Sequence, residues 1–151
     1  MSVSLILVPV AMAAVAAVSA ARAGGAQAGT VCAVQTRMRD ADLLAAALRD
    51  SSATVDTHGD DLLAAWTGVR ARFTRGPDGV WSAHFTGEVD EARAVAIVRA
   101  VDAAYGRQVQ RAVLDRLRER APLAGLRVES ESVGADESVR LVFTVEEGGA
   151  A

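Results

Sequence analysis

Apolar and polar residues alternate most regularly near the middle of the chain. Val69, Ala71 and Phe73 alternate with polar residues, and a second alternating segment, WSAHFTG, follows the turn sequence GPDG. Alternation with a period of two places one side of a strand inward, and Pro and Gly favour a turn. The pattern predicts a β-hairpin with one apolar face, and it places His84 on the polar face beside the arginines of the first strand.

Two other segments repeat apolar residues with the period of an α-helix. The first, DADLLAAALRD, places Leu and Ala on one stripe, and Asp40 is a candidate N-cap. The second is a long segment in which Asp90 can cap the start, Gly106 can bend the helix and Pro122 ends it. The sequence therefore predicts one short helix and one long helix.

Four further segments are rich in β-branched and apolar residues and are predicted to be strands: TVCAVQT, ATVDT, LRVESES and SVRLVFTVE. The last two are joined by VGADE and form a second predicted hairpin. The resulting order over residues 30–147 is β-α-β-β-β-α-β-β. Hairpins in place of regular βαβ units predict an α+β domain, with one mainly antiparallel sheet and helices packed on one face.

An uncharged apolar run from Val3 to Ala21 precedes this domain and has about the 20 residues that a membrane-spanning helix needs. A cleaved signal peptide would begin with positive charge, which MSVSL lacks. The arginines from Arg22 onward follow the run, which favours a cytoplasmic domain. We therefore expect residues 1–22 to be a single transmembrane helix in the cell membrane, followed by a flexible linker at 23–29. A signal peptide with a secreted domain and a buried or interfacial helix are the alternatives.

Small residues recur every four positions in this segment, at Ala13, Ala17, Ala21 and Gly25. Small residues at this spacing let membrane helices pack closely, so they are candidate helix-packing residues for self-association. Alanine richness alone explains the repeat equally well. At the other end of the chain, residues 148–151 are expected to form a disordered tail.

Composition narrows the classes of function. The chain has 151 residues, which suits one domain, and its aromatic content of 4% predicts a core of short side chains. The net charge of −3 argues against nucleic-acid binding, which needs a strong positive field. Cys32 is the single cysteine, so it cannot form an intramolecular disulfide, and its apolar surroundings suggest a buried thiol.

The candidate chemical groups each have a simpler structural interpretation. His58 lies in HGDD, a polar turn, where a metal site would need three or four converging ligands. No metal or cofactor is therefore expected. Arg107, Arg111 and Arg118 share one face of the long predicted helix and are candidates for contact with anionic lipid or phosphate. Acidic neighbours dilute this face, so a solvated surface is the favoured interpretation.

The order of elements and several segments resemble an uncharacterised domain family of cyanobacteria and algal plastids, known as a hypothetical chloroplast reading frame. The similar segments are VQTRMRDADLLAAAL, the central hairpin with Trp and Gly, the long helix carrying Tyr105, and SVRLVF. The chain departs from that family in its N-terminal extension and its few aromatic residues. The family has no established activity, so no site residue is carried over. The resemblance implies an accessory role beside an AAA-type ATPase.

These observations predict a membrane-anchored, non-catalytic interaction or accessory module within a larger assembly. Its expected partners are the lipid bilayer and either a protein or a second copy of the chain, and a small-molecule substrate is not expected. The alternative is a small hydrolase or transferase with a site around His84 and His58.

Overall fold

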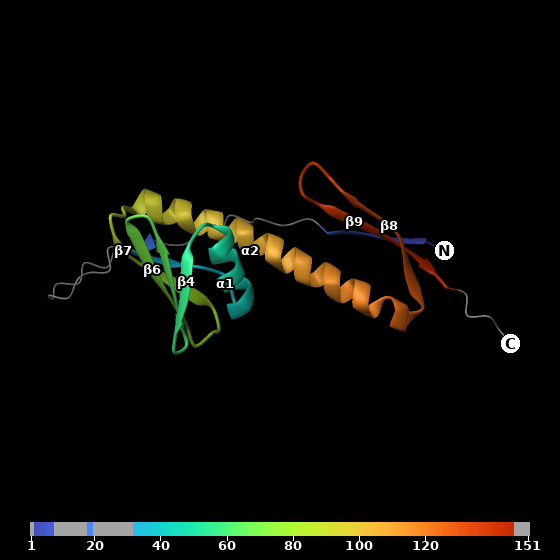
Figure 1. The fold of residues 1–151 in the computed structure, drawn as a ribbon, viewed down its shortest axis with the longest axis horizontal. Helices are drawn as coiled ribbons and strands as arrows, with labels where there is room; N and C mark the ends of the chain where they lie inside the picture. The colour runs from blue at the N-terminus through green and yellow to red at the C-terminus, as the bar shows by residue number, and fades with distance from the viewer. Residues whose placement is uncertain (1, 8–17, 20–31, 147–151) are drawn as a thin grey trace. The chain divides into compact units, whose positions relative to one another are not determined.

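The computed structural model describes residues 2–7, 18–19 and 32–146 (Figure 1). These residues form two compact units that divide within the long helix. The larger unit lies within residues 11–105, and the smaller unit combines residues 1–10 with residues 106–151. Each unit has its own hydrophobic core.

The larger unit is built on a six-stranded sheet in which every pair of neighbouring strands is antiparallel. The strand order is β2-β3-β7-β6-β5-β4. The strands are β2 (Val18–Ser19), β3 (Cys32–Gln35), β4 (Thr54–His58), β5 (Asp61–Trp66), β6 (Val69–Arg75) and β7 (Trp81–Gly87). Helix α1 (Ala41–Asp50) and the first half of α2 (Glu91–Arg120) belong to the same unit.

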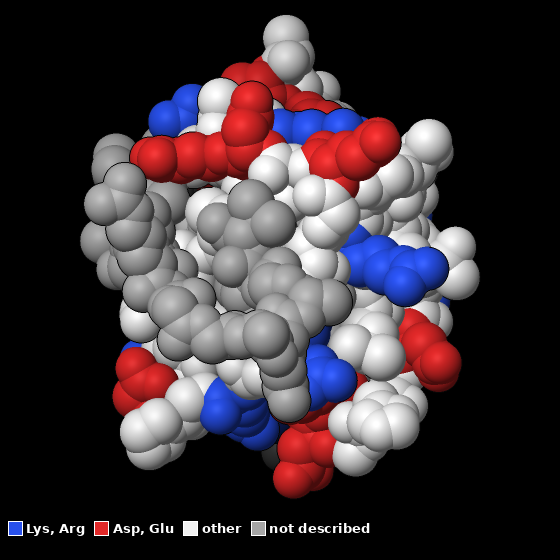
Figure 2. Space-filling model, turned by 90° about the vertical axis from the view of Figure 1, so that its left-hand side faces the viewer, with Lys and Arg blue, Asp and Glu red and all other residues white. Residues whose placement is uncertain are grey.

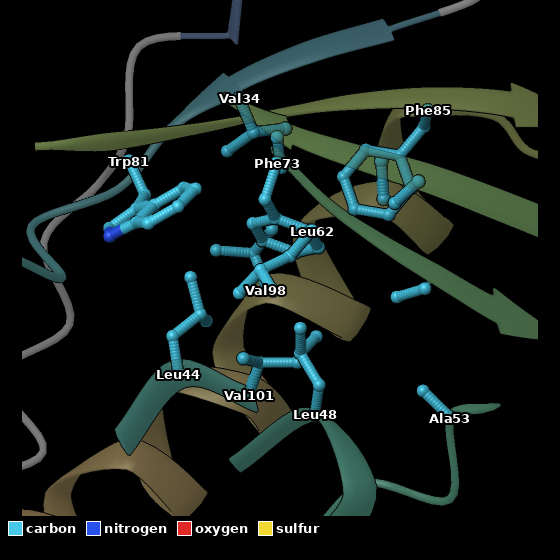
Figure 3. Close-up of a cluster of buried hydrophobic side chains, with 14 of the residues drawn as sticks. Val34, Leu44, Leu48, Ala53, Leu62, Phe73, Trp81, Phe85, Val98 and Val101 are labelled. Atoms are coloured by element: carbon cyan, nitrogen blue, oxygen red, sulfur yellow. The ribbon is translucent and has the colours of Figure 1, made fainter. Parts of the chain in front are cut away.

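One face of this sheet forms the core with both helices. Phe73 and Phe85 point inward and are fully buried, together with Leu44 and Leu48 from α1 and Val101 from α2 (Figure 3). Several of the remaining core positions are alanines, as the low aromatic content suggested: Ala47, Ala64, Ala71, Ala83, Ala94 and Ala104. The opposite face of the sheet carries the alternate side chains of each strand, which point away from this core.

Two contacts fix the start of α1. Asp40 caps the helix, because its carboxylate accepts a hydrogen bond from the backbone N–H of Leu43 at 3.0 Å, as the sequence predicted. The hydroxyl of Tyr105 accepts hydrogen bonds from the backbone N–H groups of Arg39 and Asp40 at 3.3 and 3.1 Å. A side chain of α2 therefore holds the segment that leads into α1.

Replacing Tyr105 with phenylalanine is expected to lower the free energy of unfolding by about 1 kcal/mol, because both N–H groups lose their acceptor. Equilibrium unfolding in urea measures this change. The matched control is Ser82→Ala, which also removes one hydroxyl and is expected to change stability by less than about 0.5 kcal/mol. Equal losses in the two variants would contradict a structural role for the Tyr105 hydroxyl.

The smaller unit contains a three-stranded antiparallel sheet in the order β1-β9-β8. Its elements are β1 (Ser2–Leu7), the second half of α2, a 3-10 helix (Pro122–Ala124), β8 (Leu126–Val133) and β9 (Val139–Val145). Leu114 and Ala121 pack against Val139, Leu141 and Phe143. This core is small, with only these five residues buried among those described.

The fold class is α+β with antiparallel sheets and two helices, as predicted. The structure differs in having two sheets instead of one, and it contains three strands that were not predicted, β1, β2 and β5. The sequence of β5, DLLAAW, is nearly continuous in apolar residues and lacks the alternation that marks the neighbouring strands.

The predicted transmembrane helix is not supported where the structure describes it. Ser2–Leu7 is a β-strand, in which Val3, Leu5 and Leu7 lie opposite Phe143, Leu141 and Val139 of β9. Pairing with β9 satisfies the backbone of this segment without a helix. Among residues 2–7, 18–19 and 32–146, no helix is sufficiently long and apolar to cross a membrane.

Three other sequence-based predictions concern residues that the structure does not describe. The small-residue positions Ala13, Ala17, Ala21 and Gly25 lie outside the described residues, as do the predicted linker at 23–29 and the predicted tail at 148–151. Helix packing through those alanines stays a prediction.

Candidate functional site

The face of the six-stranded sheet that points away from α1 and α2 carries a groove of about 850 Å³. We call this face the outer face. The side chains that line the groove come from four neighbouring strands: Thr54 and Asp56 of β4, Leu63 and Ala65 of β5, Arg70, Arg72 and Thr74 of β6, and His84 and Thr86 of β7. Strand alternation places these side chains on one face, and the core residues Ala64 and Ala71 between them complete the lining.

Strand register arranges these side chains in two rows across the sheet. One row runs through Asp56, Leu63, Arg72 and His84, which are direct cross-strand partners. The second row runs through Thr54, Ala65, Arg70 and Thr86. Each arginine therefore has an apolar side chain of β5 on one side and a polar side chain of β7 on the other.

The two arginines differ in how far the chain already compensates their charge. Arg72 Nη1 lies 3.9 Å from Asp61 Oδ2, and the Arg72 side chain is 56% exposed. Within the described part of the chain, Arg70 forms no salt bridge, and its side chain is exposed. Two guanidinium groups on one strand, one of them uncompensated, can bind an anionic group through paired hydrogen bonds.

Polar groups at the two borders of the groove already have partners. His84 Nε2 and Thr74 Oγ1 are 3.2 Å apart, within hydrogen-bonding distance. On the opposite border, Asp56 Oδ1 accepts a hydrogen bond from the backbone N–H of Thr57 at 2.8 Å. His84 and Asp56 therefore mark the two borders of the groove, and Arg70 and Arg72 lie on a strand between them.

The two histidines of the alternative enzymatic interpretation do not converge. His58 ends β4 and His84 lies on β7, so β5 and β6 separate them. With about 4.8 Å between neighbouring strands, the separation is at least about 14 Å, which is too far for both rings to act on one bond. The described residues contain no group of three or more potential metal ligands.

The arginine face predicted on the long helix is partly used within the smaller unit. Arg107 and Arg111 are exposed. Arg118 donates to Asp115 at 2.8 Å and to Glu131 at 2.6 Å. The hydrogen bond to Glu131 is the main cause that raises the pKa of Arg118. Contact of this face with an anionic partner stays a prediction, and for Arg118 it would compete with two ion pairs.

Cys32 is buried in β3 and belongs to the core of the larger unit. Burial raises the pKa of its thiol, and the negative charge of Glu91 adds to that effect. A raised pKa keeps the sulfur protonated near neutral pH, and the thiolate is the reactive form. Cys32 therefore contributes packing and is not part of the groove.

No protein-family model matches the chain, and no match is found among the curated proteins or the solved structures. The resemblance to the plastid and cyanobacterial family accordingly stays a prediction.

The polar face with the arginines and His84 was predictable from the sequence, whereas the apolar side of the groove, Leu63 and Ala65, was not predicted. One local signal could have located β5. His58 and Asp61 are paired residues that enclose only two others, and Gly59 has a φ of 63°. A two-residue turn with Gly is typical of a tight hairpin, which requires a strand to follow it directly.

Proposed function

We propose that the chain is a non-catalytic interaction module whose larger unit binds a protein partner through the outer face of the six-stranded sheet. The observation that supports this proposal is the groove, in which Arg70 and Arg72 stand between apolar and hydroxyl side chains. The opposite face already packs against two helices, whereas among the described residues no helix packs on the outer face.

The lining suits a protein surface better than a small molecule. Small-molecule pockets are mostly apolar and enclose the ligand, with a few polar groups placed for orientation. Here the groove is open to solvent, and seven of its eleven lining residues are arginine, threonine, histidine or aspartate. Arginine is enriched in protein interfaces, where its planar group forms several hydrogen bonds and its stem packs on apolar atoms.

Filling the groove tests this proposal. Ala65 lies on β5, one of the two inner strands of the four that line the groove, and is partly buried. Ala65→Trp therefore places a bulky side chain in the groove without changing the charge. We expect this variant to fold and to lose the partner that wild-type protein captures from cells. Ala100→Trp, at an exposed position of α2, is the matched control and should retain capture. Retention by both variants would refute binding through this face.

The remaining parts of the sequence-based hypothesis stay predictions. They are a location at the cell membrane, self-association, and partnership with an AAA-type ATPase. Residues Ser2–Leu7 cannot be a strand of the smaller sheet and part of a membrane-spanning helix at the same time. Binding through the outer face depends on none of these predictions.

A further inference from the structure

We infer that the groove on the outer face receives an extended acidic segment of a partner protein, whose carboxylates bind Arg70 and Arg72. This inference rests on the proposed function and adds the chemistry of the partner. Three observations carry it: the spacing of the two arginines, the side chains that flank them, and the distribution of charge and aromatic residues around them.

The spacing matches that of an extended peptide. Arg70 and Arg72 are alternate residues of β6, so their side chains leave the same face about 6.7 Å apart. Alternate residues of an extended peptide repeat at the same distance. A peptide that runs along β6 can therefore place carboxylates at successive alternate positions over both guanidinium groups, each of which can bind a carboxylate through two hydrogen bonds.

The flanking side chains suit the rest of such a peptide. Leu63 lies opposite Arg72, and Ala65 lies opposite Arg70, so an apolar strip runs beside the arginines. The methylene groups of glutamate side chains can pack on this strip. On the other side, His84 and Thr86 occupy the corresponding positions of β7. Because His84 Nε2 already contacts Thr74 Oγ1, the groups that can bond a peptide backbone are the Thr86 hydroxyl and the second ring nitrogen of His84.

The acidic groups of the groove are compatible with this occupant. The contact between Arg72 and Asp61 is long, at 3.9 Å, and exposed, so it contributes little and a well-placed carboxylate can replace it. Asp56 lies across the apolar strip from Arg72, with Leu63 between them. Its charge disfavours carboxylates on the β4 side and restricts them to the arginine side.

Charge and aromatic residues favour a peptide over a nucleic acid. Proteins that bind single strands stack the bases on exposed aromatic rings. In the larger sheet Phe73, Trp81 and Phe85 are buried in the core, and Trp66 is partly buried and packs against the same core. Figure 2 shows acidic and basic side chains interspersed on the face turned to the viewer, and the chain carries a net charge of −3. A local pair of arginines fits a short acidic segment better than a polyanion.

Fluorescence anisotropy with the full chain tests the inference. The probe is a short labelled peptide in which Glu alternates with Thr, and we expect saturable binding. Replacing both arginines, Arg70→Gln with Arg72→Gln, should weaken binding about tenfold, as expected for the loss of two partly exposed ion pairs. The control is Arg49→Gln with Arg99→Gln, which makes the same change in charge on the exposed surfaces of α1 and α2. This control should retain wild-type affinity.

Two control peptides examine spacing and charge. A peptide with Gln in place of every Glu should not bind, and one with the same Glu residues in an uninterrupted block should bind more weakly than the alternating one. Equal binding of block and alternating peptides, or equal losses in the two double variants, would reduce the effect to net charge and overturn the inference. Absence of peptide binding, or stronger binding of a single-stranded oligonucleotide, would also overturn it.

The capture experiment separates this inference from the proposed function. If Ala65→Trp abolishes capture of the cellular partner while the Arg70 and Arg72 double variant retains it, the groove binds a partner by other chemistry and only the inference fails. If both variants retain capture, the proposed function fails as well.

Discussion

Replacing Phe73 with alanine is expected to lower the free energy of unfolding by about 3–5 kcal/mol, the usual cost of removing a fully buried phenylalanine. Phe73 has an exposed fraction of 0% and lies among side chains of the sheet and both helices (Figure 3). Leu62 and Val98 lie beside Phe73 in this core, so neighbouring side chains can fill only part of the cavity that the substitution leaves.

Urea unfolding followed by tryptophan fluorescence measures this loss. Both tryptophans of the chain, Trp66 and Trp81, belong to the larger unit and report its unfolding directly. Phe73→Leu is the control and should cost only about 1–2 kcal/mol, because it retains most of the apolar volume. A loss below about 1 kcal/mol for Phe73→Ala would show that this residue is not in the core.

Leu141→Ala is expected to remove most of the stability of the smaller unit. Leu141 is fully buried, and a Leu-to-Ala change in a core costs about 2–5 kcal/mol. Only four other described residues are buried in that core, so little apolar burial is left to compensate. Faster amide hydrogen exchange across residues 106–146 is the expected result, with slower exchange retained within residues 32–105.

The neighbouring residue provides the control for this prediction. Val142 lies on the same strand, points to the other side of the smaller sheet and is only half-buried. Val142→Ala should change exchange across residues 106–146 much less than Leu141→Ala does. Similar effects of the two changes would mean that the buried side of the three-stranded sheet contributes no more to stability than its more exposed side.

Elements with strong local signals were predictable from the sequence. The hairpin of β6 and β7 is marked by alternation and by a Pro-Gly turn, and α1 by Asp40 and a regular apolar stripe. Both signals arise within a few residues, and the structure confirms both elements. The long helix is likewise confirmed as α2, which begins directly after Asp90 and ends shortly before Pro122.

Pairings between distant segments were not predictable in the same way. Strand β1 pairs with β9, which lies more than 130 residues further along the chain. An uncharged apolar segment satisfies its backbone equally well as a helix or as a paired strand, and only the presence of β9 selects the strand. The same reasoning explains the second sheet, since periodicity predicts strands but does not say which of them pair.

Only the polar part of the candidate site was predictable from the sequence. Alternation along β6 and β7 placed the arginines and His84 on one polar face, and the register confirms that Arg72 and His84 are direct partners. The apolar strip of Leu63 and Ala65 was missed together with β5. Without this strip, the groove was not foreseen.

The carboxylate of Asp56 has a consequence for how copies of the chain behave in a crowded solution. Strand β4 is the last strand of the sheet, so one side of its backbone has no strand partner among the described residues. His58 and Asp61 close a two-residue turn, which directs the N–H of the preceding residue, Thr57, to that free side. Asp56 occupies this N–H group and adds a negative charge beside it. A second copy would have to displace that carboxylate before pairing edge to edge, so the aspartate protects the sheet against aggregation.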